Sequence, residues 1–320
     1  MKKLIFQGLA AWILAILCSV SAWAKPAVLI PGGQTVGIKL YSRGLVITGF
    51  DQKSAAKAAG LKKGDVILAV DDNEIHTASS LRDYLEEEQI VLTVLRNGKE
   101  AKFRVRPSQT EQGKKLGAYI RDSISGIGTV TYYDPTTGDF GALGHGVSDT
   151  DAELLLPVEA GVVVSSSVAE VVKGTHGKPG ELKGQFDVHK ILGQVDENTE
   201  KGIFGILQKP IAGAPLPVAS REEVTEGCAV IRANVDGSEI REYSVEILKI
   251  EPQEDLSGRD LLLRITDRRL LNQTGGIVQG MSGSPIIQDG KLVGAVTHVL
   301  VNDPTRGYGI FIENMLDAAG

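Results

Sequence analysis

Residues 118–320 alternate short apolar runs with glycine-containing turns, and this alternation constrains the fold more than any other feature. Almost no segment in it has the spacing of a long amphipathic helix. Pairs of runs meet at Asp236-Gly237 and at Asp289-Gly290, dipeptides typical of tight hairpins. The 38 glycines and the 5% aromatic content of the chain also favour many short strands. About 200 residues of this kind predict a mainly β domain made of two small barrels rather than one sandwich.

Residues 31–107 have a different pattern, in which β-rich apolar runs alternate with short helices. The first helix is expected to end at Gly60 and the second to begin after a capping residue, Thr77. The last two runs form a predicted hairpin that turns at Asn97-Gly98. This order, and above all the phrase "SAAKAAGLKKGDVILAVDDNEI", resembles a PDZ domain. The polar segment that follows, residues 108–117, is the predicted linker to the barrels.

PDZ domains bind an extended peptide by adding it as a strand to a sheet edge. The resemblance places this groove beside the loop 41–44 and the strand that follows it, with a helix as the opposite wall. Apolar side chains there are equally compatible with a buried core, so the residues alone leave both interpretations open. The predicted groove residues are Gly44, Leu45, Val46, Ile47, Leu81 and Leu85.

The N-terminal 24 residues have the pattern of a secretory signal peptide. Lys2 and Lys3 precede an apolar run that extends through Val20, and a small-x-small motif ends at Ala24. The same segment could serve as an uncleaved membrane anchor. We therefore expect an exported protein that associates with a membrane through this segment if it is retained.

Composition excludes several other classes of function. A net charge of -6 argues against nucleic acid as a partner. After removal of the signal segment one cysteine remains, Cys228, so no internal disulfide can form. The sequence contains no cysteine and histidine cluster with metal-ligand spacing, and we predict neither a metal nor an organic cofactor.

Ser282 lies in the motif "GMSGSP", between Gly280 and Gly283. A Gly-x-Ser-Gly-x-Pro run followed by strand, turn and strand is also how the nucleophile region of chymotrypsin-like proteases reads. A serine nucleophile needs a base and backbone amides directed at the oxyanion. We predict that the amides of Gly280 and Ser282 supply the latter. The alternative is a tight turn of small residues without chemistry.

Five histidines are candidates for the base. His145 stands in "FGALGHGVSD", where a strand leads into a loop and flanking glycines leave the ring accessible, so it is the predicted base. His298 lies in an apolar strand and is expected to be a core residue. His76 belongs to the first domain, and His176 and His189 have polar surroundings typical of loops.

The carboxylate that would orient the base is ambiguous from the residues alone. Asp267 follows a predicted strand upstream of Ser282, whereas Asp149 and Asp151 lie a few residues beyond His145. Aspartates at strand ends are also common turn formers. Chemistry by itself leaves Asp267 and Asp149 as equal alternatives.

Three long segments resemble the stage IV sporulation protein B family of serine peptidases. They are "LIPGGQTVGIKL", "IRDSISGIGTVTYYDPTTGDFGALGH" and "TGGIVQGMSGSPIIQDGKLVGAVTHVLVNDPTRGYGIFIENML". The resemblance implies a membrane-targeting segment, a PDZ domain and a chymotrypsin-like peptidase domain over residues 118–320. It also implies that His145, Asp267 and Ser282 are the catalytic residues.

The family resemblance further implies a role in the sporulation signalling of endospore-forming bacteria. Such a peptidase is exported into the space between the two membranes around the forespore and processes itself. It then cleaves a membrane-bound regulatory subunit of an intramembrane protease complex, which triggers activation of a late sigma factor. Its PDZ domain would bind its own N-terminal region or the target. The alternatives are an inactive exported PDZ scaffold and a general envelope quality-control protease.

Overall fold

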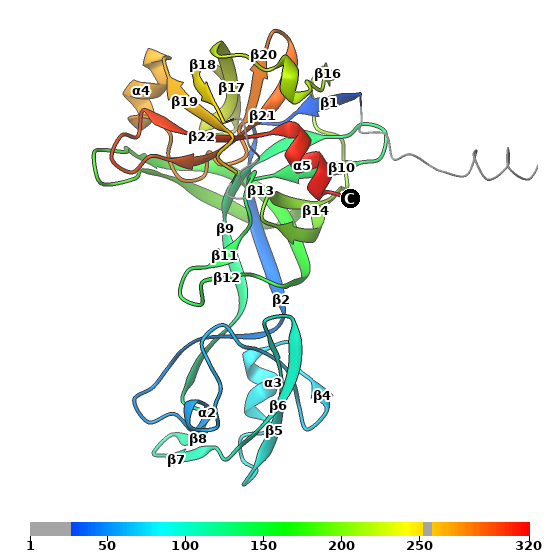
Figure 1. Cartoon of the computed structure of the whole chain (residues 1–320), viewed down its shortest axis with the longest axis vertical. Helices are drawn as coiled ribbons and strands as arrows, with labels where there is room; N and C mark the ends of the chain where they lie inside the picture. The colour runs from blue at the N-terminus through cyan, green and yellow to red at the C-terminus, as the bar shows by residue number, and fades with distance from the viewer. Residues whose placement is uncertain (1–26, 252–257) are drawn as a thin grey trace, which may run out of the picture.

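The computed structural model describes residues 27–251 and 258–320. The predicted signal or anchor segment, residues 1–24, lies outside these ranges. Figure 1 shows a smaller body below a larger one, with the strands β2 (Thr35–Phe50) and β9 (Ala118–Tyr133) running between them. Within the described ranges, no helix is both long and apolar enough to cross a membrane.

The smaller body is the predicted PDZ domain. Ser54 and Thr77 cap its two helices through their side chains, and the hairpin turns at Asn97-Gly98 as predicted. Its apolar core includes Leu45, Ile67 and other buried side chains of the same region. The elements that belong to this body alone are α2 (Ala55–Ala58), β3 (Val66–Val70), β4 (Asn73–Glu74), α3 (Ala78–Arg82), β5 (Ile90–Arg96) and β6 (Lys99–Val105).

The segment predicted as a linker, residues 108–117, is folded onto the PDZ domain. It forms a hairpin of β7 (Ser108–Thr110) and β8 (Gly113–Lys115). Leu116 is only 4% exposed and belongs to the core cluster of the PDZ domain, against which Ala118 and Ile120 also pack. The polar composition of the hairpin concealed this apolar contact at its end.

The first half of the larger body is a closed ring of six paired strands. The pairings run from β2 to β9, β10, β15, β14 and β13 and return from β13 to β2. The strands not yet defined are β10 (Asp139–Ala142), β13 (Val158–Val172), β14 (Glu181–Thr199) and β15 (Gly202–Leu207). Two further pairs of short strands accompany the ring. β1 (Val28–Pro31) pairs with ring strand β9 and with β16 (Leu216–Pro217), and β11 (Ser148–Asp149) pairs with β12 (Leu154–Leu155).

The second half is a closed barrel of six strands in the order β17-β18-β19-β22-β21-β20. Its hairpins turn at Gly237-Ser238, one residue beyond the predicted Asp236-Gly237, and at Asp289-Gly290, as the sequence predicts. A short 3-10 helix, η1 (Arg221–Glu223), precedes the barrel. The strands are β17 (Gly227–Asp236), β18 (Glu239–Ile250), β19 (Leu261–Ile265), β20 (Pro285–Gln288), β21 (Lys291–Val299) and β22 (Arg306–Phe311), and the helices are α4 (Arg268–Thr274) and α5 (Ile312–Ala318).

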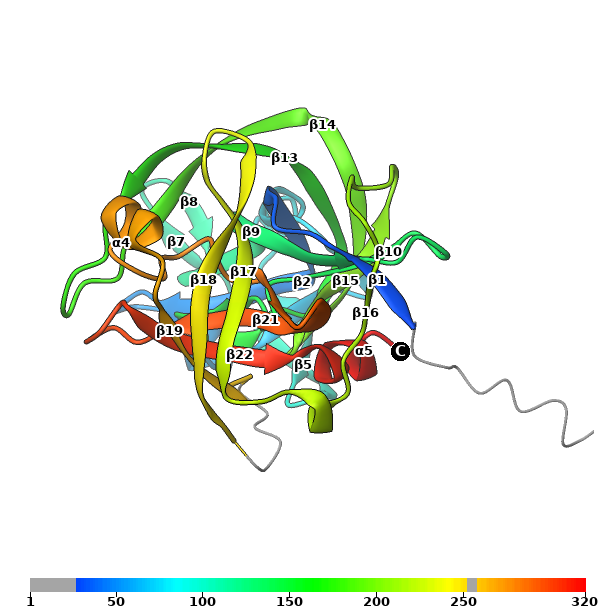
Figure 2. The ribbon, with the colours of Figure 1, turned by 90° about the horizontal axis from the view of Figure 1, so that it is seen from above.

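The two barrels pack side by side, which confirms the predicted mainly β fold with two barrels after a PDZ domain. In the view from above, β17 to β22 lie in front while β13 and β14 curve behind them (Figure 2). The hairpin of β13 and β14 reaches the second barrel at Val168, which pairs with Gly237. Each barrel has its own apolar core.

Candidate active site

Ser282 lies in the tight turn that connects α4 to β20. Gly280 and Gly283 have φ angles of 98° and 95°, which favour glycine over residues with a side chain. A Cβ atom at Gly283 would lie 2.0 Å from the carbonyl oxygen of Thr129 on β9. The glycines of the motif therefore let the serine turn approach the first barrel closely.

The amides predicted to form an oxyanion hole are those of Gly280 and Ser282. Among the described residues neither amide donates a hydrogen bond, whereas the intervening Met281 amide donates to Val278 O at 3.1 Å. Ser282 is half-buried, and Gly280 is buried. This pattern is what an oxyanion hole requires, because its donors must have no other acceptor.

His145 enters the site from the end of β10. Leu143 and Gly144 both have a φ of 71°, and a Cβ atom at Gly144 would lie 3.0 Å from Thr297 Cγ2. The His145 Nδ1 atom is 2.9 Å from Gly146 O. Because a carbonyl only accepts, Nδ1 carries the proton and Nε2 has a lone pair available to act as a base. Burial of the imidazole lowers the pKa of His145, partly offset by this bond.

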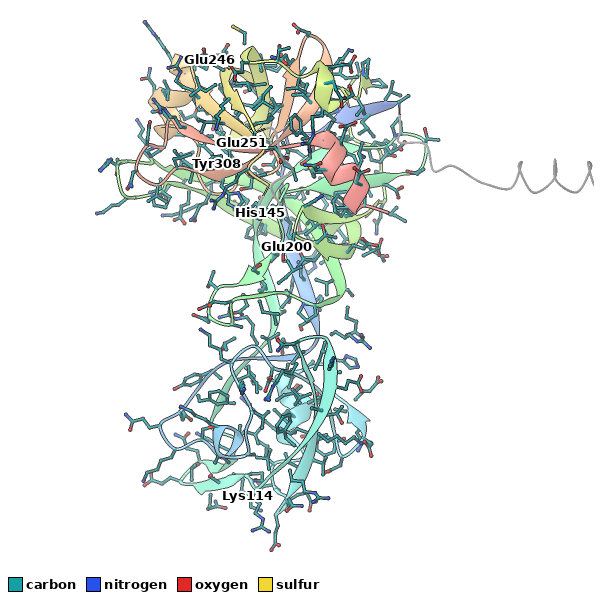
Figure 3. All side chains as sticks on the ribbon, viewed as in Figure 1. Lys114, His145, Glu200, Glu246, Glu251 and Tyr308 are labelled. Atoms are coloured by element: carbon teal, nitrogen blue, oxygen red, sulfur yellow. The ribbon has the colours of Figure 1, made fainter. Side chains whose placement is uncertain are left out.

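The serine and the histidine both contact the end of β21. The Ser282 hydroxyl donates to Thr297 O at 2.7 Å, and the His145 ring lies 5.1 Å from the His298 ring, centroid to centroid. Figure 3 shows His145 on the half of the larger body nearer the PDZ domain. His298 was expected to be a core residue, but it is half-buried and its ring lies against that of His145.

The structure does not bring Asp267 to His145. Asp267 is the N-cap of α4, where its carboxylate accepts from the amides of Arg269 at 2.8 Å and Leu270 at 3.4 Å. The Arg269 guanidinium donates to both carboxylate oxygens, and Ser244 N contributes a contact at 3.4 Å. Chiefly because of Arg269, the pKa of Asp267 falls to about 2. Its described contacts are those of a helix cap and an ion pair.

The alternative carboxylate, Asp149, is also engaged elsewhere. It is buried, forms an ion pair with Arg121 and accepts from Ala152 N at 2.7 Å. Asp151 pairs with the same arginine at 3.1 Å. In the described structure neither aspartate contacts His145, whose orienting partner is a backbone carbonyl instead.

The strand predicted to line the PDZ groove, Gly44–Ile47, is covered on both edges. Leu45 pairs with Ile67 of β3, and Ile47 pairs with Ile120 of β9. Its three apolar side chains are fully buried in the core. A peptide could not add to this strand without displacing β9, so the structure corrects this part of the prediction.

A groove instead lies between β9 and α3. No described strand pairs with the second edge of β9 over residues 118–122, and Ala78 N of α3 donates to Asp122 there at 3.2 Å. Leu85, in the turn after α3, is part of the lining of this groove, whereas Leu81 of α3 borders it but is only 2% exposed and belongs to the PDZ core. Its volume is about 640 Å³, and the residues that complete it include Arg82, Leu116, Gly117, Ala118 and Ile120.

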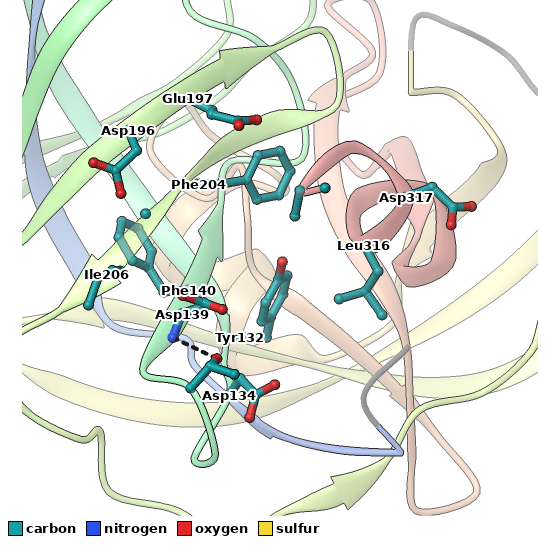
Figure 4. Close-up of a pocket in the computed structure, with 14 residues that line it drawn as sticks. Tyr132, Asp134, Asp139, Phe140, Asp196, Glu197, Phe204, Ile206, Leu316 and Asp317 are labelled. Carbon is teal, nitrogen blue, oxygen red and sulfur yellow. Dashed lines mark hydrogen bonds between the residues drawn. The ribbon is translucent and has the colours of Figure 1, made fainter. Parts of the chain in front are cut away.

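A separate pocket of about 450 Å³ lies beside α5, away from the Ser282 turn (Figure 4). Its walls include the aromatic rings of Tyr132, Phe140 and Phe204. Burial raises the pKa of the Tyr132 phenol. Carboxylates surround the rings, namely Asp134, Asp139, Asp196, Glu197 and Asp317. In the part of the chain that the structure describes, no group of three potential ligands is placed to hold a metal ion.

A double-barrel domain with a serine-bearing turn, preceded by a PDZ domain, defines a PDZ-containing serine peptidase. Residues 112–316 match the family model of SpoIVB peptidase S55, and residues 32–106 match the PDZ domain model. The chain therefore belongs to the SpoIVB peptidase S55 family.

Individual relatives are more distant. The "Putative zinc metalloprotease Atu1380" of Agrobacterium fabrum is 29% identical over 169 residues, which cover 51% of this chain. The match spans 42% of the length of that protein. The inactive form of the Rv3671c protease has 14% identity and a TM-score of 0.35 over 61% of this chain and 84% of that chain. The active form from M. tuberculosis has 15% identity and a TM-score of 0.35 over 62% and 75%.

Proposed function

We propose that Ser282 is the nucleophile of this serine peptidase and that His145 is its general base. The observation that carries the proposal is the convergence of the two side chains, one from each barrel, on Thr297 and His298 of β21. The amides of Gly280 and Ser282, which donate no hydrogen bond among the described residues, lie on the same turn as the Ser282 side chain. A nucleophile, a base in the correct tautomer and oxyanion donors are thus supplied by adjacent segments.

The reaction begins when the Ser282 hydroxyl turns from Thr297 O toward Nε2 of His145. The Oγ–C bond to the peptide carbonyl forms as the hydroxyl proton passes to Nε2. The oxyanion is stabilised by the two amides until the C–N bond breaks, and the leaving amine takes the proton from His145. Water then attacks the acyl-enzyme by the same series of steps, with His145 again as the base, and the carboxylic acid product is released. Gly146 O holds the Nδ1 proton and supports the charged imidazolium, the task that a carboxylate performs in a triad.

We infer that the substrate is a membrane-bound regulatory protein of an intramembrane protease complex, cleaved during sporulation signalling outside the cytoplasm. The family membership and the sequence motifs support this inference. The groove between β9 and α3 offers apolar contacts from Leu85 and Ile120 to an extended peptide, beside charged side chains that include Arg82 and Lys114. A segment of the target or of the chain's own N-terminal region would occupy that groove.

A fluorophosphonate probe tests the chemistry directly. Attack by Ser282 forms an Oγ–P bond, expels fluoride and transfers the proton to His145, so the wild-type chain should be labelled at Ser282. Ser282→Ala should not react, and His145→Gln should react far more slowly. Absence of labelling in the folded wild-type protein would contradict the proposal and favour a PDZ scaffold without activity.

Cleavage assays test the substrate. The wild-type chain and Ser282→Ala are each incubated with a purified regulatory subunit and with unfolded casein. A single cut in the subunit by the wild type alone supports the signalling role. Rapid degradation of casein with no cut in the subunit would favour a quality-control protease.

A further inference from the structure

Thr129 connects the serine turn to the first barrel. It lies on β9, is 1% exposed, and donates from its amide to Ser282 O at 3.0 Å. Its hydroxyl donates to Gly280 O at 2.8 Å. Its carbonyl accepts from Leu143 N at 3.2 Å, two residues before His145. One buried residue therefore contacts the turn of the proposed nucleophile and the segment that leads to the proposed base.

The serine turn is held through its carbonyl oxygens. A peptide unit is planar, so fixing the carbonyl also fixes the direction of the amide in that unit. From Gln279 to Ser282, each carbonyl oxygen accepts a hydrogen bond within the described structure. The donors, in chain order of the acceptors, are Leu182 N at 2.8 Å, Thr129 Oγ1 at 2.8 Å, Ser284 N at 2.9 Å and Thr129 N at 3.0 Å.

Only one of these donors is a side chain. The other three are backbone amides, which substitution does not remove, whereas the hydroxyl of Thr129 can be deleted by a single change. The acceptor, Gly280 O, is in a buried turn, where losing a donor is unfavourable. The peptide 280–281 carries the Met281 amide and joins the two units that carry the Gly280 and Ser282 amides. Release of this peptide frees the backbone angles at Gly280 and Met281, on which the relative direction of those two amides depends.

We propose that Thr129 is a positioning residue that holds the oxyanion-hole amides in their reactive direction. The proposal rests on the function proposed above, in which Ser282 is the nucleophile. Thr129 does not touch the substrate or the reacting atoms. It acts through the Gly280 carbonyl and through the contact of its amide with Ser282 O. Contacts that the substrate makes outside the oxyanion hole do not depend on Thr129.

The test compares Thr129→Val, which keeps the shape but removes the hydroxyl, with Thr129→Ser, which keeps the hydroxyl. Both are made in the full chain and treated with a fluorophosphonate over a range of concentrations. In Thr129→Val we expect the maximal labelling rate to fall on the order of 10- to 100-fold. This fall is no larger than the cost of losing one oxyanion donor completely. The half-saturating concentration should stay within about twofold, because ground-state binding is unchanged. Thr129→Ser should restore most of the rate.

Thr131 provides a matched control on the same strand. It is fully buried, and within the described residues its hydroxyl has no hydrogen-bond partner. Thr131→Val should therefore label at the wild-type rate, with an unfolding temperature measured alongside that of Thr129→Val. If Thr129→Val does not fold, Thr129→Ala is assayed below its unfolding temperature and should show the same loss of rate.

Two results would overturn the inference. One is a wild-type maximal rate in a folded variant that lacks the Thr129 hydroxyl, and the other is a rate in Thr129→Ser as low as in Thr129→Val. A wild-type chain that fails to label at Ser282 would instead refute the proposed nucleophile. The two failures are thus distinguished by the wild-type reaction alone.

Discussion

The proposed base, His145, is oriented by a backbone carbonyl rather than by a carboxylate. The proton on Nδ1 of His145 points to Gly146 O, so the tautomer required for catalysis is already present. A neutral carbonyl stabilises the imidazolium less than a carboxylate does, so nothing opposes the effect of burial strongly. Neutral His145 is consequently favoured down to a lower pH than an exposed imidazole would be.

The lowered pKa of His145 predicts the acid limb of the pH profile. The base works only when neutral, and its pKa lies below the ordinary value of about 6.5. Activity should therefore persist as pH falls through 6.5 and be lost only at the lower pKa. The labelling rate of Ser282, measured from pH 4 to pH 8, checks this; an acid limb centred above about 6.5 would contradict it.

Asp267→Asn distinguishes a helix cap from a triad acid. Asparagine still caps a helix but loses the ion pair of the buried carboxylate with Arg269, so we expect a loss of about 1–3 kcal/mol in stability. The labelling rate of the folded variant should remain within about threefold, whereas loss of a triad acid costs about 10⁴-fold. Thermal unfolding and fluorophosphonate labelling measure the two effects. A large loss of rate without a loss of stability would restore Asp267 as the acid.

The depressed pKa of Asp267 also has a consequence for acid stability. Its ordinary pKa is about 3.9, and it falls to about 2 in the folded chain. The charged form is favoured by folding, so this stabilisation is present above pH 4 and is lost as pH falls from about 4 toward 2. Urea unfolding gives the free energy of unfolding at pH 5 and at pH 2.5. The decrease of this free energy between the two pH values should be smaller for Asp267→Asn than for the wild type. Equal differences would contradict the assignment.

Among the elements, β9 connects the PDZ core with the proposed active site. Its first residues pack on the PDZ core, its middle carries Thr129 below the serine turn, and its end pairs with β10, which leads to His145. A peptide bound to the open edge of β9 would therefore contact the same strand that supports the site. The strand is continuous, so the PDZ domain is joined to the active site by one element rather than by a linker.

The position of the groove can be tested by charge. Leu85→Glu places a carboxylate between β9 and α3 and should abolish binding of a peptide selected from a display library on the wild-type chain. Tyr41→Glu is the control, because Tyr41 is 41% exposed in the segment 41–44, which was first predicted to be a peptide-binding loop but belongs to strand β2. It should bind normally. Fluorescence polarisation measures both, and the reverse pattern would return the groove to the segment 41–44.

At the scale of the whole molecule, the two domains share strands. β2 pairs with β13 in its first half and with β3 in its second, so one strand belongs to a barrel and to the PDZ sheet. The core of the PDZ domain is completed by Leu116, and Ile120 packs against it. The boundary predicted at residue 107 therefore cuts through a folded unit.

Chain fragments test this boundary. A fragment of residues 44–107 lacks Leu116 and Ile120, whereas residues 44–122 include both. Because removal of one buried leucine side chain costs about 2–5 kcal/mol, the shorter fragment should be largely unfolded or much less stable. Urea unfolding followed by circular dichroism compares the two. Equal stability would show that β9 is dispensable for the PDZ domain.

Much of the fold was determined by local sequence. Apolar runs between glycine turns defined the hairpins near Asp236-Gly237 and at Asp289-Gly290, and capping side chains set the starts of α2 and α3. The glycines around Ser282 indicated a turn that only they permit, since both have positive φ angles. These features depend on residues close together in the chain, which is why pattern and turn chemistry reveal them.

Contacts between distant segments were decided only by the tertiary structure. The pairing of β9 with β2 moved the PDZ groove, and the packing of one barrel on the other brought His298 to His145. Asp267 and Asp149 looked equivalent as strand-end carboxylates, but each is bound to an arginine that the sequence did not link to it. Such pairings depend on which strand edges and charges remain unsatisfied once the barrels close, and that balance is a property of the whole molecule.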